Sequence, residues 1–437
     1  MARKRRKLPT EPIEATIEDL SHDGRGVCRV DGKVTFVHGA LPGEQVRFKL
    51  TSRRRDLDEG EVVEVIAAAP ERVEARCPHV GQCGGCALQH LPPETQIARK
   101  QETLLENLRR IGEVEPTAVI APLTAASWGY RRRARLSARH VAKKHRTLVG
   151  FRERAGRFVA DLQECHVLIP DVGFRIAELG ALLDRLEAHR DIPQIEIAAG
   201  DDTTVLVIRH MVELSGPDRE VLAAFEERTG LRVVLQSGGP KSLVALRGDL
   251  PRLHYALGDL ELEFTATNFV QVNAPLNAAM VELAVDKLAL EAGQTVVDLF
   301  CGLGNFSLPI ARRCGEVLGI EGDDELVALA AHNAARNGIE NARFERADLR
   351  EPITLPACDR VLVDPPRSGA LDALGAIAAT GAEQVVYVSC HPGSLARDAG
   401  LLVREHGFTL TEAGVMDMFP HTAHVESIAV FDRGGRS

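Results

Sequence analysis

Two short apolar segments in the last fifth of the chain each end at a residue capable of chemistry. Residues 385–388 are Val-Val-Tyr-Val and lead to Cys390, and residues 361–363 are Val-Leu-Val and lead to Asp364. Continuous apolar runs rich in β-branched residues predict parallel strands that are covered on both faces. Ligands of open α/β sheets bind outside the carboxyl ends of the strands. The sequence therefore predicts that Asp364 and Cys390 face one pocket, although a cysteine at a random position is usually a small buried hydrophobe.

The composition is that of a globular protein of two or three domains, with 437 residues of which 45% are hydrophobic. No run of about 18 apolar residues is present, and the basic segment 3–7 is not followed by the apolar stretch of a signal peptide. We therefore expect a cytoplasmic protein without membrane contact, and nothing in the sequence indicates an obligate protein partner. The nine cysteines are odd in number and irregularly spaced, which argues against disulfides and favours metal binding or catalysis.

Positive charge is concentrated in the first third of the chain. Residues 1–150 contain 27 Lys and Arg against 19 Asp and Glu, a net charge of +8, whereas residues 151–437 contain 26 against 43, a net charge of −17. The first third is therefore the part expected to face a polyanion such as a nucleic acid.

The N-terminal region divides into a basic tail, residues 1–10, and a predicted small β-barrel, residues 11–68. About five short alternating segments in the barrel are separated by turns that contain Gly, Pro and Asp. Such a barrel can be a spacer, but barrels of this size often bind oligonucleotides. Basic residues along one predicted edge support the second interpretation: Arg47, Lys49 and Arg53–Arg55.

Three cysteines follow the barrel within ten residues, in the pattern C-x5-C-G-G-C formed by Cys77, Cys83 and Cys86. Cys165 is the only further cysteine in the next hundred residues without an assigned role. Glycines between the thiols allow the backbone to fold tightly around a metal centre. Four thiolates suit an iron–sulfur cluster or structural zinc. Three clustered ligands and one remote ligand favour the iron–sulfur cluster, because zinc sites usually supply two pairs.

Residues 70–264 are expected to form an α+β central domain. Within it, helix 94–113 should pack on the catalytic domain through one apolar face and expose its basic residues. The apolar positions are Ile97, Leu104, Leu108 and Ile111, and the basic ones are Arg99, Lys100, Arg109 and Arg110.

Strand alternation in segment 130–139 places Arg131, Arg133 and Arg135 on one face, with Tyr130 beside them. This stripe suits contacts with RNA phosphates and an unstacked base, although an ordinary exposed strand would show the same pattern.

The last domain, residues 265–437, has the pattern of a Rossmann-like cofactor site. A strand ends near Asp298, a Gly-x-Gly turn follows, the next strand ends at Glu321, and a third leads to Asp348. A nicotinamide site is the obvious alternative, but Ser307 replaces the third glycine that such sites use for close helix–strand packing. Acids at successive strand ends suit a cationic, phosphate-free nucleoside such as S-adenosylmethionine.

In the order of its motifs, the chain resembles the RNA uridine-5 methyltransferases. The motifs are FVQVN (269–273), DLFCGLGNFSLPIA (298–311), Glu321, Asp348, VDPPRSG (363–369), VSCHP (388–392) and HVESIAVF (424–431). By the same resemblance the barrel is similar to a TRAM domain, and Cys77, Cys83, Cys86 and Cys165 match a four-cysteine [4Fe-4S] site. The combination of barrel and cluster resembles the branch that acts on 23S ribosomal RNA more than the transfer RNA branch.

The resemblance implies a fold and a set of site residues. The fold is a multidomain α/β protein with a TRAM-like barrel, an iron–sulfur central domain and a Rossmann-like domain that binds S-adenosylmethionine. The implied cofactor and pocket residues are Gln271, Phe300, Asn305, Glu321, Asp348 and Asp364. One departure is His391, where the family most often has Asn, so the hydrogen bonding next to Cys390 is left open.

The chemistry of uridine methylation explains the roles that we assign to Cys390 and Glu426. C5 of uracil attacks a methyl sulfonium only after the ring is converted to an enolate, which a thiolate achieves by adding at C6. Cys390 is assigned as this nucleophile. Glu426, which matches the family's base, then removes the C5 proton. The uridine must be single-stranded or flipped out.

Two other classes of protein share parts of this pattern. Amino-group methyltransferases also carry a Pro-Pro motif, but an aromatic residue typically follows it where this chain has Arg367. A non-catalytic iron–sulfur or RNA-binding protein would account for the barrel and the cysteines but would leave the series from Asp298 to Glu426 without a purpose.

Overall fold

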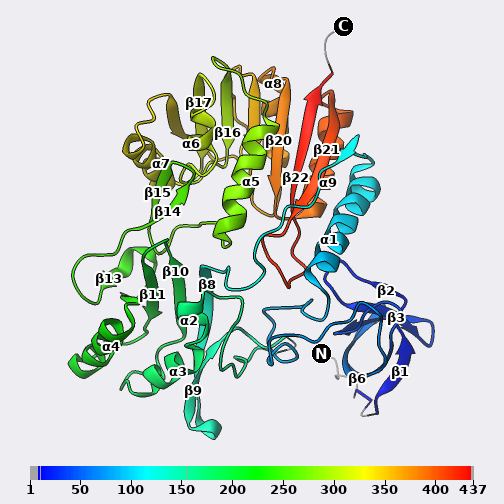
Figure 1. Ribbon diagram of the computed structural model, residues 1–437, viewed down its shortest axis with the longest axis vertical. Helices are drawn as coiled ribbons and strands as arrows, with labels where there is room; N and C mark the ends of the chain where they lie inside the picture. Colours follow the sequence, from blue (N-terminus) through cyan, green and yellow to red (C-terminus); the bar gives the residue numbers. More distant parts are fainter. Residues whose placement is uncertain (1–7, 10, 155, 435–437) are drawn as a thin grey trace, which may run out of the picture.

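The computed structural model describes residues 8–9, 11–154 and 156–434, so almost all of the predicted basic tail 1–10 lies outside the described residues. Figure 1 shows the C-terminal sheet at one end of the molecule and the barrel and central sheet at the other. Within the described ranges, no helix is both long enough and apolar enough to cross a membrane.

The N-terminal barrel has six strands in the order β1-β5-β6-β4-β3-β2 around a small apolar core that includes Phe48. Its strands are β1 (Ile13–Thr16), β2 (Asp19–Leu20), β3 (Gly26–Val30), β4 (Lys33–His38), β5 (Gln45–Arg53) and β6 (Leu57–Ala67). The predicted basic edge is largely neutralised, because Arg47 lies 2.5 Å from both Glu14 and Glu64. Arg53, Arg54 and Arg55 each also lie within 4 Å of an acid.

The central domain is built on a six-stranded sheet in the order β13-β12-β11-β10-β8-β9. The strands are β8 (Arg133–Val141), β9 (Arg146–Gly150), β10 (Gln194–Ala199), β11 (Thr204–Arg209), β12 (Arg232–Gln236) and β13 (Leu243–Ala245). The helices of this domain are α2 (Pro170–Gly173), α3 (Ile176–Asp184) and α4 (Gly216–Thr229). A separate hairpin, β14 (Leu253–Leu257) and β15 (Leu260–Phe264), leads to the last domain.

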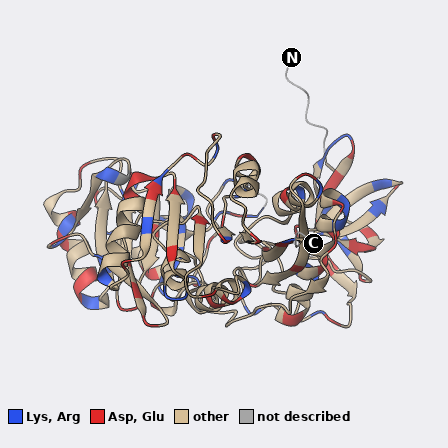
Figure 2. Cartoon of the chain, turned by 90° about the horizontal axis from the view of Figure 1, so that it is seen from above, with Lys and Arg blue, Asp and Glu red and all other residues tan. Residues whose placement is uncertain are grey.

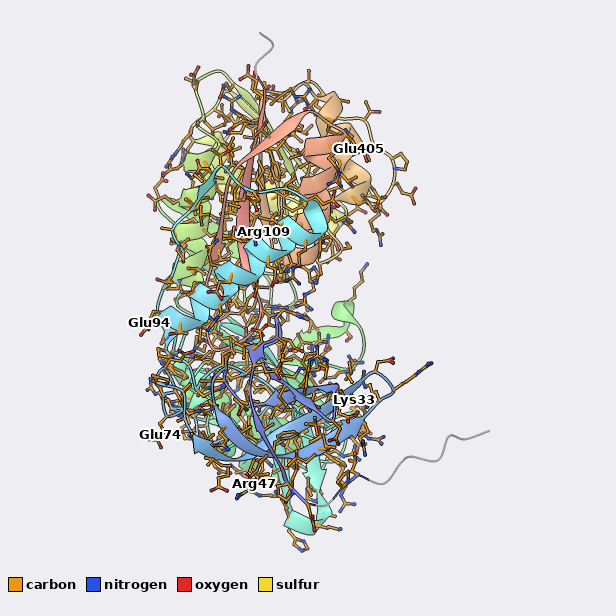
Figure 3. The ribbon with its side chains drawn as sticks, turned by 90° about the vertical axis from the view of Figure 1, so that its right-hand side faces the viewer. Lys33, Arg47, Glu74, Glu94, Arg109 and Glu405 are labelled. Carbon is orange, nitrogen blue, oxygen red and sulfur yellow. The ribbon has the colours of Figure 1, made fainter. Side chains whose placement is uncertain are left out.

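Helix α1 (Pro93–Asn107), followed by a π-helical turn at Leu108–Gly112, packs on β21 and α9 of the last domain. Figure 3 shows α1 running from Glu94 beside the barrel to Arg109 on the side of the C-terminal sheet. Two expectations for this helix were wrong. Lys100 is 3% exposed and donates to Asp417 at 2.6 Å, because the helix lies against β21 there, and Ile111 is 50% exposed because the turn geometry changes before it.

The last domain contains an eight-stranded sheet in the order β18-β17-β16-β19-β20-β22-β21-β7. The strands are β16 (Thr295–Leu299), β17 (Glu316–Glu321), β18 (Ala342–Arg346), β19 (Arg360–Val363), β20 (Gln384–Ser389), β21 (Phe408–Met416) and β22 (Glu426–Arg433). Strands β16 to β20 are parallel, whereas β22 is antiparallel to both of its neighbours. The short β7 (Ala118–Val119) comes from the N-terminal half of the chain and pairs with β21.

Successive residues of β20 belong to two different apolar cores, as the period of a strand requires. Val386 and Val388 face the core that includes α5, while Val385 and Tyr387 face the core covered by α1 and α9. All four are fully buried, so the predicted strand covered on both faces is confirmed. The helices of this domain are α5 (Ala274–Lys287), α6 (Ser307–Ala311), α7 (Asp324–Arg336), α8 (Leu374–Ala379) and α9 (Pro392–Arg404).

Candidate active site and cysteine-lined cavity

A cavity of about 730 Å³ lies at the carboxyl ends of β16, β17, β19 and β20. It brings together seven of the predicted site residues: Gln271, Phe300, Asn305, Glu321, Asp364, Cys390 and Glu426. The parallel strands bring most of them together, since their carboxyl ends meet at one edge of the sheet. Glu426 reaches the same edge as the first residue of the antiparallel β22, and Gln271 comes from the segment before α5. Arg367 also lines the cavity, as expected for a residue that could orient Cys390 or a phosphate. Four further lining residues were not singled out as site residues from the sequence: Tyr255, Phe269, Phe419 and His424.

The turn after β16 forms one wall of this cavity. Phe300, Gly302 and Gly304 all have positive φ angles, of 63°, 56° and 96°. Phe300 therefore occupies a conformation that side chains rarely adopt, and the two glycines relieve the turn around it. The N–H of Gly302 donates to Oε2 of Glu321 at 3.1 Å, which fixes the turn to the end of β17.

Asp298 lies beneath this turn and is completely buried. Ser307 Oγ donates to its Oδ2 at 2.5 Å, so the serine that replaces the third glycine serves to hold this acid. Its other oxygen, Oδ1, has no partner among the described residues. Burial, together with the nearby acids Asp364 and Glu321, raises the pKa of Asp298 to about 7.

Asn305 is oriented by two residues that the sequence did not single out. Tyr255 Oη donates to its Oδ1 at 2.8 Å, and its amide exchanges two hydrogen bonds of 3.0 Å with the amide of Asn277. Tyr255 comes from the β14–β15 hairpin and Asn277 from α5. Neither could be found from a motif, because their role depends on how the hairpin packs on the helix.

Cys390 stands between the end of β20 and the start of α9. His391 caps this helix, since its Nδ1 accepts the N–H of Ser394 at 3.1 Å. Asn at this position would accept the same bond, so His391 preserves the local geometry. Burial raises the pKa of the Cys390 thiol to about 11, and the carboxyl groups of Glu426 and Asp364 act in the same direction.

Glu426 and Asp364 form the acidic side of the cavity. Burial raises the pKa of Asp364 to about 7, and burial together with Asp364 raises the pKa of Glu426 well above its usual value. Arg367 opposes the shifts of both Glu426 and Cys390. It contacts His424 Nδ1 at 2.8 Å, a hydrogen bond at the rim of the cavity.

Asp348 is the one predicted cofactor residue that does not line the cavity. It follows β18, and its carboxylate pairs with Arg350 at 2.8 Å near the surface. This pair lowers the pKa of Asp348 to about 2.

A second cavity lies in the central domain and is lined by all four predicted metal ligands: Cys77, Cys83, Cys86 and Cys165. Phe151, Leu162 and Val167 supply apolar walls. Burial raises the pKa values of all four thiols, to about 12 for Cys86 and about 11 for Cys165. Among the described residues, no group of three His, Cys, Asp or Glu side chains is placed so as to hold a single metal ion.

The loop between β21 and β22 connects the two cavities through His421. The carbonyl of His421 accepts the N–H groups of Ala87 (2.8 Å) and Leu88 (3.0 Å), the two residues after Cys86. Its N–H donates to Gln96 Oε1 at 2.8 Å, and its ring stacks on Trp128 with the centroids 3.8 Å apart. His421 is 2% exposed with a φ of 66°, a strained conformation held by these contacts. The same loop carries Phe419 and His424 into the first cavity.

Comparison with known proteins identifies two family models along the chain. Residues 230–433 match the model described as tRNA (Uracil-5-)-methyltransferase, and residues 6–65 match the TRAM domain. The crystal structure of the Pyrococcus abyssi tRNA (uracil-54, C5)-methyltransferase in complex with S-adenosyl-L-homocysteine has the same fold. The TM-score is 0.73 at 23% identity, and the match covers 96% of this chain and 100% of that one.

Curated relatives match over nearly their whole length. The 23S rRNA (uracil(1939)-C(5))-methyltransferase RlmD of Alkalilimnicola ehrlichii is 53% identical, with 99% of each chain covered. The protein of that name from Stenotrophomonas maltophilia is 52% identical, with 99% of this chain and 100% of the relative covered. Identity at this level from end to end makes the chain a member of the RNA uracil-5 methyltransferase family, with an N-terminal TRAM domain.

Proposed function

We propose that this S-adenosylmethionine-dependent enzyme methylates C5 of the uridine at position 1939 of 23S rRNA. The observation that carries this assignment is the 53% identity over 99% of a relative that bears this activity in its name. The substrate would be cytoplasmic ribosomal RNA. A transfer RNA substrate is the alternative, and it has the weaker support of a 23% identical structure.

S-Adenosylmethionine fits the cavity of about 730 Å³ by charge as well as by position. It supplies an electrophilic methyl group on a cationic sulfonium. The residues that would hold it are Gln271, Phe300, Asn305, Glu321 and Asp364. An acidic lining favours a cationic ligand, and Oδ1 of Asp298 is a buried acceptor left without a partner among the described residues. Asp348 could contact the adenine only after releasing Arg350.

Cys390 would supply the nucleophile. Its sulfur adds to C6 of uracil, which turns C5 into the nucleophile that takes the methyl group. In the free cavity the thiol stays protonated, because burial, Glu426 and Asp364 raise its pKa to about 11. A cation bound beside these groups favours their ionised forms. The reactive thiolate would therefore form chiefly when the cavity is loaded.

Glu426 would act as the base that completes the reaction. Once methylated, C5 carries a proton that must leave before the bond between Cys390 and C6 can break by β-elimination. Burial and Asp364 raise the pKa of Glu426, so its carboxylate binds a proton tightly once ionised. Phe269, which is 69% exposed at the edge of the cavity, is placed to stack on the flipped uracil.

Cys77, Cys83, Cys86 and Cys165 would hold a [4Fe-4S] cluster. Support comes from the cavity with apolar walls that all four cysteines line, although one of them lies about eighty residues from the others in the sequence. Anaerobically purified protein should be brown and contain about four iron atoms per chain. A colourless preparation that contains zinc would assign the site to structural zinc instead.

The test of the mechanism is covalent trapping on a 23S rRNA fragment. Glu426→Gln should accumulate a denaturation-resistant complex with RNA in the presence of S-adenosylmethionine, because the C5 proton cannot leave. Cys390→Ala should form no such complex. Mapping of 5-methyluridine at nucleotide resolution tests the target position, and modification elsewhere in ribosomal or transfer RNA would refute the assignment to 1939.

A further inference from the structure

A groove on the central domain combines unpaired arginines with an exposed aromatic ring. It has a volume of about 520 Å³ and lies between the outer face of β8, the start of β9 and the described segments 151–154 and 156–159. We propose that this groove binds a single-stranded segment of the RNA substrate, several nucleotides away from the uridine in the active site. The proposal extends the proposed function, because it assumes that the substrate is RNA.

The charges in the groove are available for a ligand. Arg139, Arg152 and Arg157 line it, and all three side chains are exposed. None of them forms an ion pair with any residue in the described ranges. Lys144, by contrast, lies 2.5 Å from Asp161, so that pair adds little net charge. Glu153 also lines the groove, so three arginines without ion pairs face one such acid. The excess of positive charge is still suited to phosphates.

Phe158 supplies the second property that single-stranded RNA needs. Its side chain is 68% exposed, although a large apolar ring gains free energy from burial. Its main chain is hydrogen-bonded locally, since its carbonyl accepts the N–H of Glu153 at 2.9 Å and Arg152 pairs with Val159. An exposed ring beside basic side chains is the arrangement that stacks bases without reading their sequence.

Strand β8 links this groove to the active site. The main chain of Arg132, just before β8, donates to Val272 at 2.9 Å next to the cavity residue Gln271, and Arg133 donates to Ala266 at 2.7 Å. Arg133 and Arg139 lie on the same face of the strand, six residues and therefore about 20 Å apart. RNA that follows this face would pass several nucleotides between the two sites.

In segment 130–139, the residues predicted to contact RNA are buried or already paired, and the residue available for RNA lies at the end of the segment. Tyr130 is 5% exposed and its hydroxyl donates to Pro420. Arg133 is committed to a carbonyl, and Arg135 pairs with Glu196 at 3.0 Å. Arg139 ends the same segment but was not part of the predicted stripe, and it reaches the groove without a partner among the described residues.

The experiment compares two RNA substrates that carry the same target uridine. One is a short oligonucleotide with two nucleotides on each side, and the other is a 23S rRNA fragment long enough to reach the groove. We expect a clear effect of the triple variant Arg139→Gln/Arg152→Gln/Arg157→Gln on the long RNA only. KM for the long RNA should rise about tenfold, whereas kcat for the long RNA and both constants for the short RNA should stay unchanged. Three lost contacts to single-stranded phosphates should reduce the slope of log K against log salt by about 2.

Matched substitutions in the same domain control for general loss of charge or of aromatic surface. Arg185→Gln/Arg190→Gln removes two exposed arginines away from the groove, and Phe174→Ala removes an aromatic ring that is 55% exposed. Neither should change KM for the long RNA, whereas Phe158→Ala should raise it. A 2-aminopurine placed several nucleotides from the uridine should be quenched by the wild-type protein and not by Phe158→Ala.

Two results would overturn the proposal that the groove binds RNA. One is an equal loss on the short and long RNA, and the other is an unchanged salt slope in the triple variant, which would leave the groove to a protein partner. Failure of the proposed function looks different, because the wild-type enzyme would then methylate neither RNA. The salt slope is measured by binding alone and stands apart from turnover.

Discussion

The cavity around Cys390 and the cavity around Cys86 both bury thiols, but they are held in place by different kinds of structure. Cys390 is fixed between a buried strand and a helix start, in a sheet whose strands are hydrogen-bonded on both sides. Cys77, Cys83 and Cys86 lie in residues 68–92, which contain no helix or strand. That segment is tied to the rest of the protein by a few main-chain bonds, such as Gly84 to Arg152 at 2.9 Å.

Because of this difference, the two cavities are expected to keep their shape by different means. The sheet edge is maintained by its apolar cores, so the active site exists before any ligand binds. The loop segment has only a small apolar core, in which Ala69, Leu88 and Leu91 pack with Leu41, and the part around the cysteines is expected to depend on its metal centre for stability. His421 connects the two regions. Its carbonyl accepts hydrogen bonds from the residues after Cys86, and its loop carries His424 into the active-site cavity.

The largest expected effect is on activity alone. Cys390→Ala should lower methylation by on the order of 10⁶-fold, as in other enzymes that lose a covalent nucleophile. The melting temperature and iron content should stay at wild-type values, because the sheet does not depend on this thiol. Labelled methyl transfer and calorimetry measure the two properties, and substantial RNA methylation by this variant would end the covalent mechanism.

The opposite pattern is expected for Cys86→Ser. Loss of a metal ligand should remove folding free energy directly and lower the melting temperature by on the order of 10 °C. Activity should fall with the folded fraction. Cys314→Ser, at a half-buried cysteine in a turn of the catalytic domain, is the control and should keep both properties. A Cys86→Ser protein with normal stability would show that the loop holds itself in place without the metal.

A third prediction concerns the link between the two regions. Gln96→Leu removes the hydrogen bond to the N–H of His421 and those from Gln96 Nε2 to the carbonyls of Leu88 and Leu91. It should lower kcat about tenfold, equivalent to about 1.4 kcal/mol in the barrier. Iron content should not change. Gln101→Leu is a matched control on α1, because the buried amide of Gln101 has no partner among the described residues. Equal kcat values for the two variants would show that His421 does not position the loop between β21 and β22.

The smallest expected effect is a pH dependence of stability in the unliganded enzyme. The pKa of Asp364 is raised to about 7 in the folded protein, so the folded state binds its proton more tightly than the unfolded chain does. Its contribution to stability is therefore present below the unfolded pKa and lost as the pH rises through about 7. Asp364→Asn should flatten the fall in melting temperature between pH 5 and 8, whereas the exposed control Asp372→Asn should not. An unchanged profile would contradict the raised pKa.

Charge patterning alone was a poorer guide than strand endings. The excess of basic residues in the first third predicted an RNA-facing barrel edge, yet Arg47 lies beside both Glu14 and Glu64. Figure 2 shows basic and acidic positions interspersed along the chain. Net charge counts residues but not their partners, and cross-strand pairing is set by register. Lys100 was misjudged for a similar reason, because the acid that pairs with it, Asp417, is 317 positions away.

Strand endings were enough to predict that Glu321, Asp364 and Cys390 lie at the ligand side of one sheet, and all three line its cavity. Gln271, Phe300, Asn305 and Glu426 line the same cavity, but the family resemblance implied them and no local pattern did. Local patterns have this power because a buried parallel strand needs an apolar run, and its carboxyl end must face the ligand side. The support from Tyr255 and Asn277, the surface position of Asp348 and the link through His421 required the folded chain. Those features arise from packing between segments distant in sequence, for which no local pattern exists.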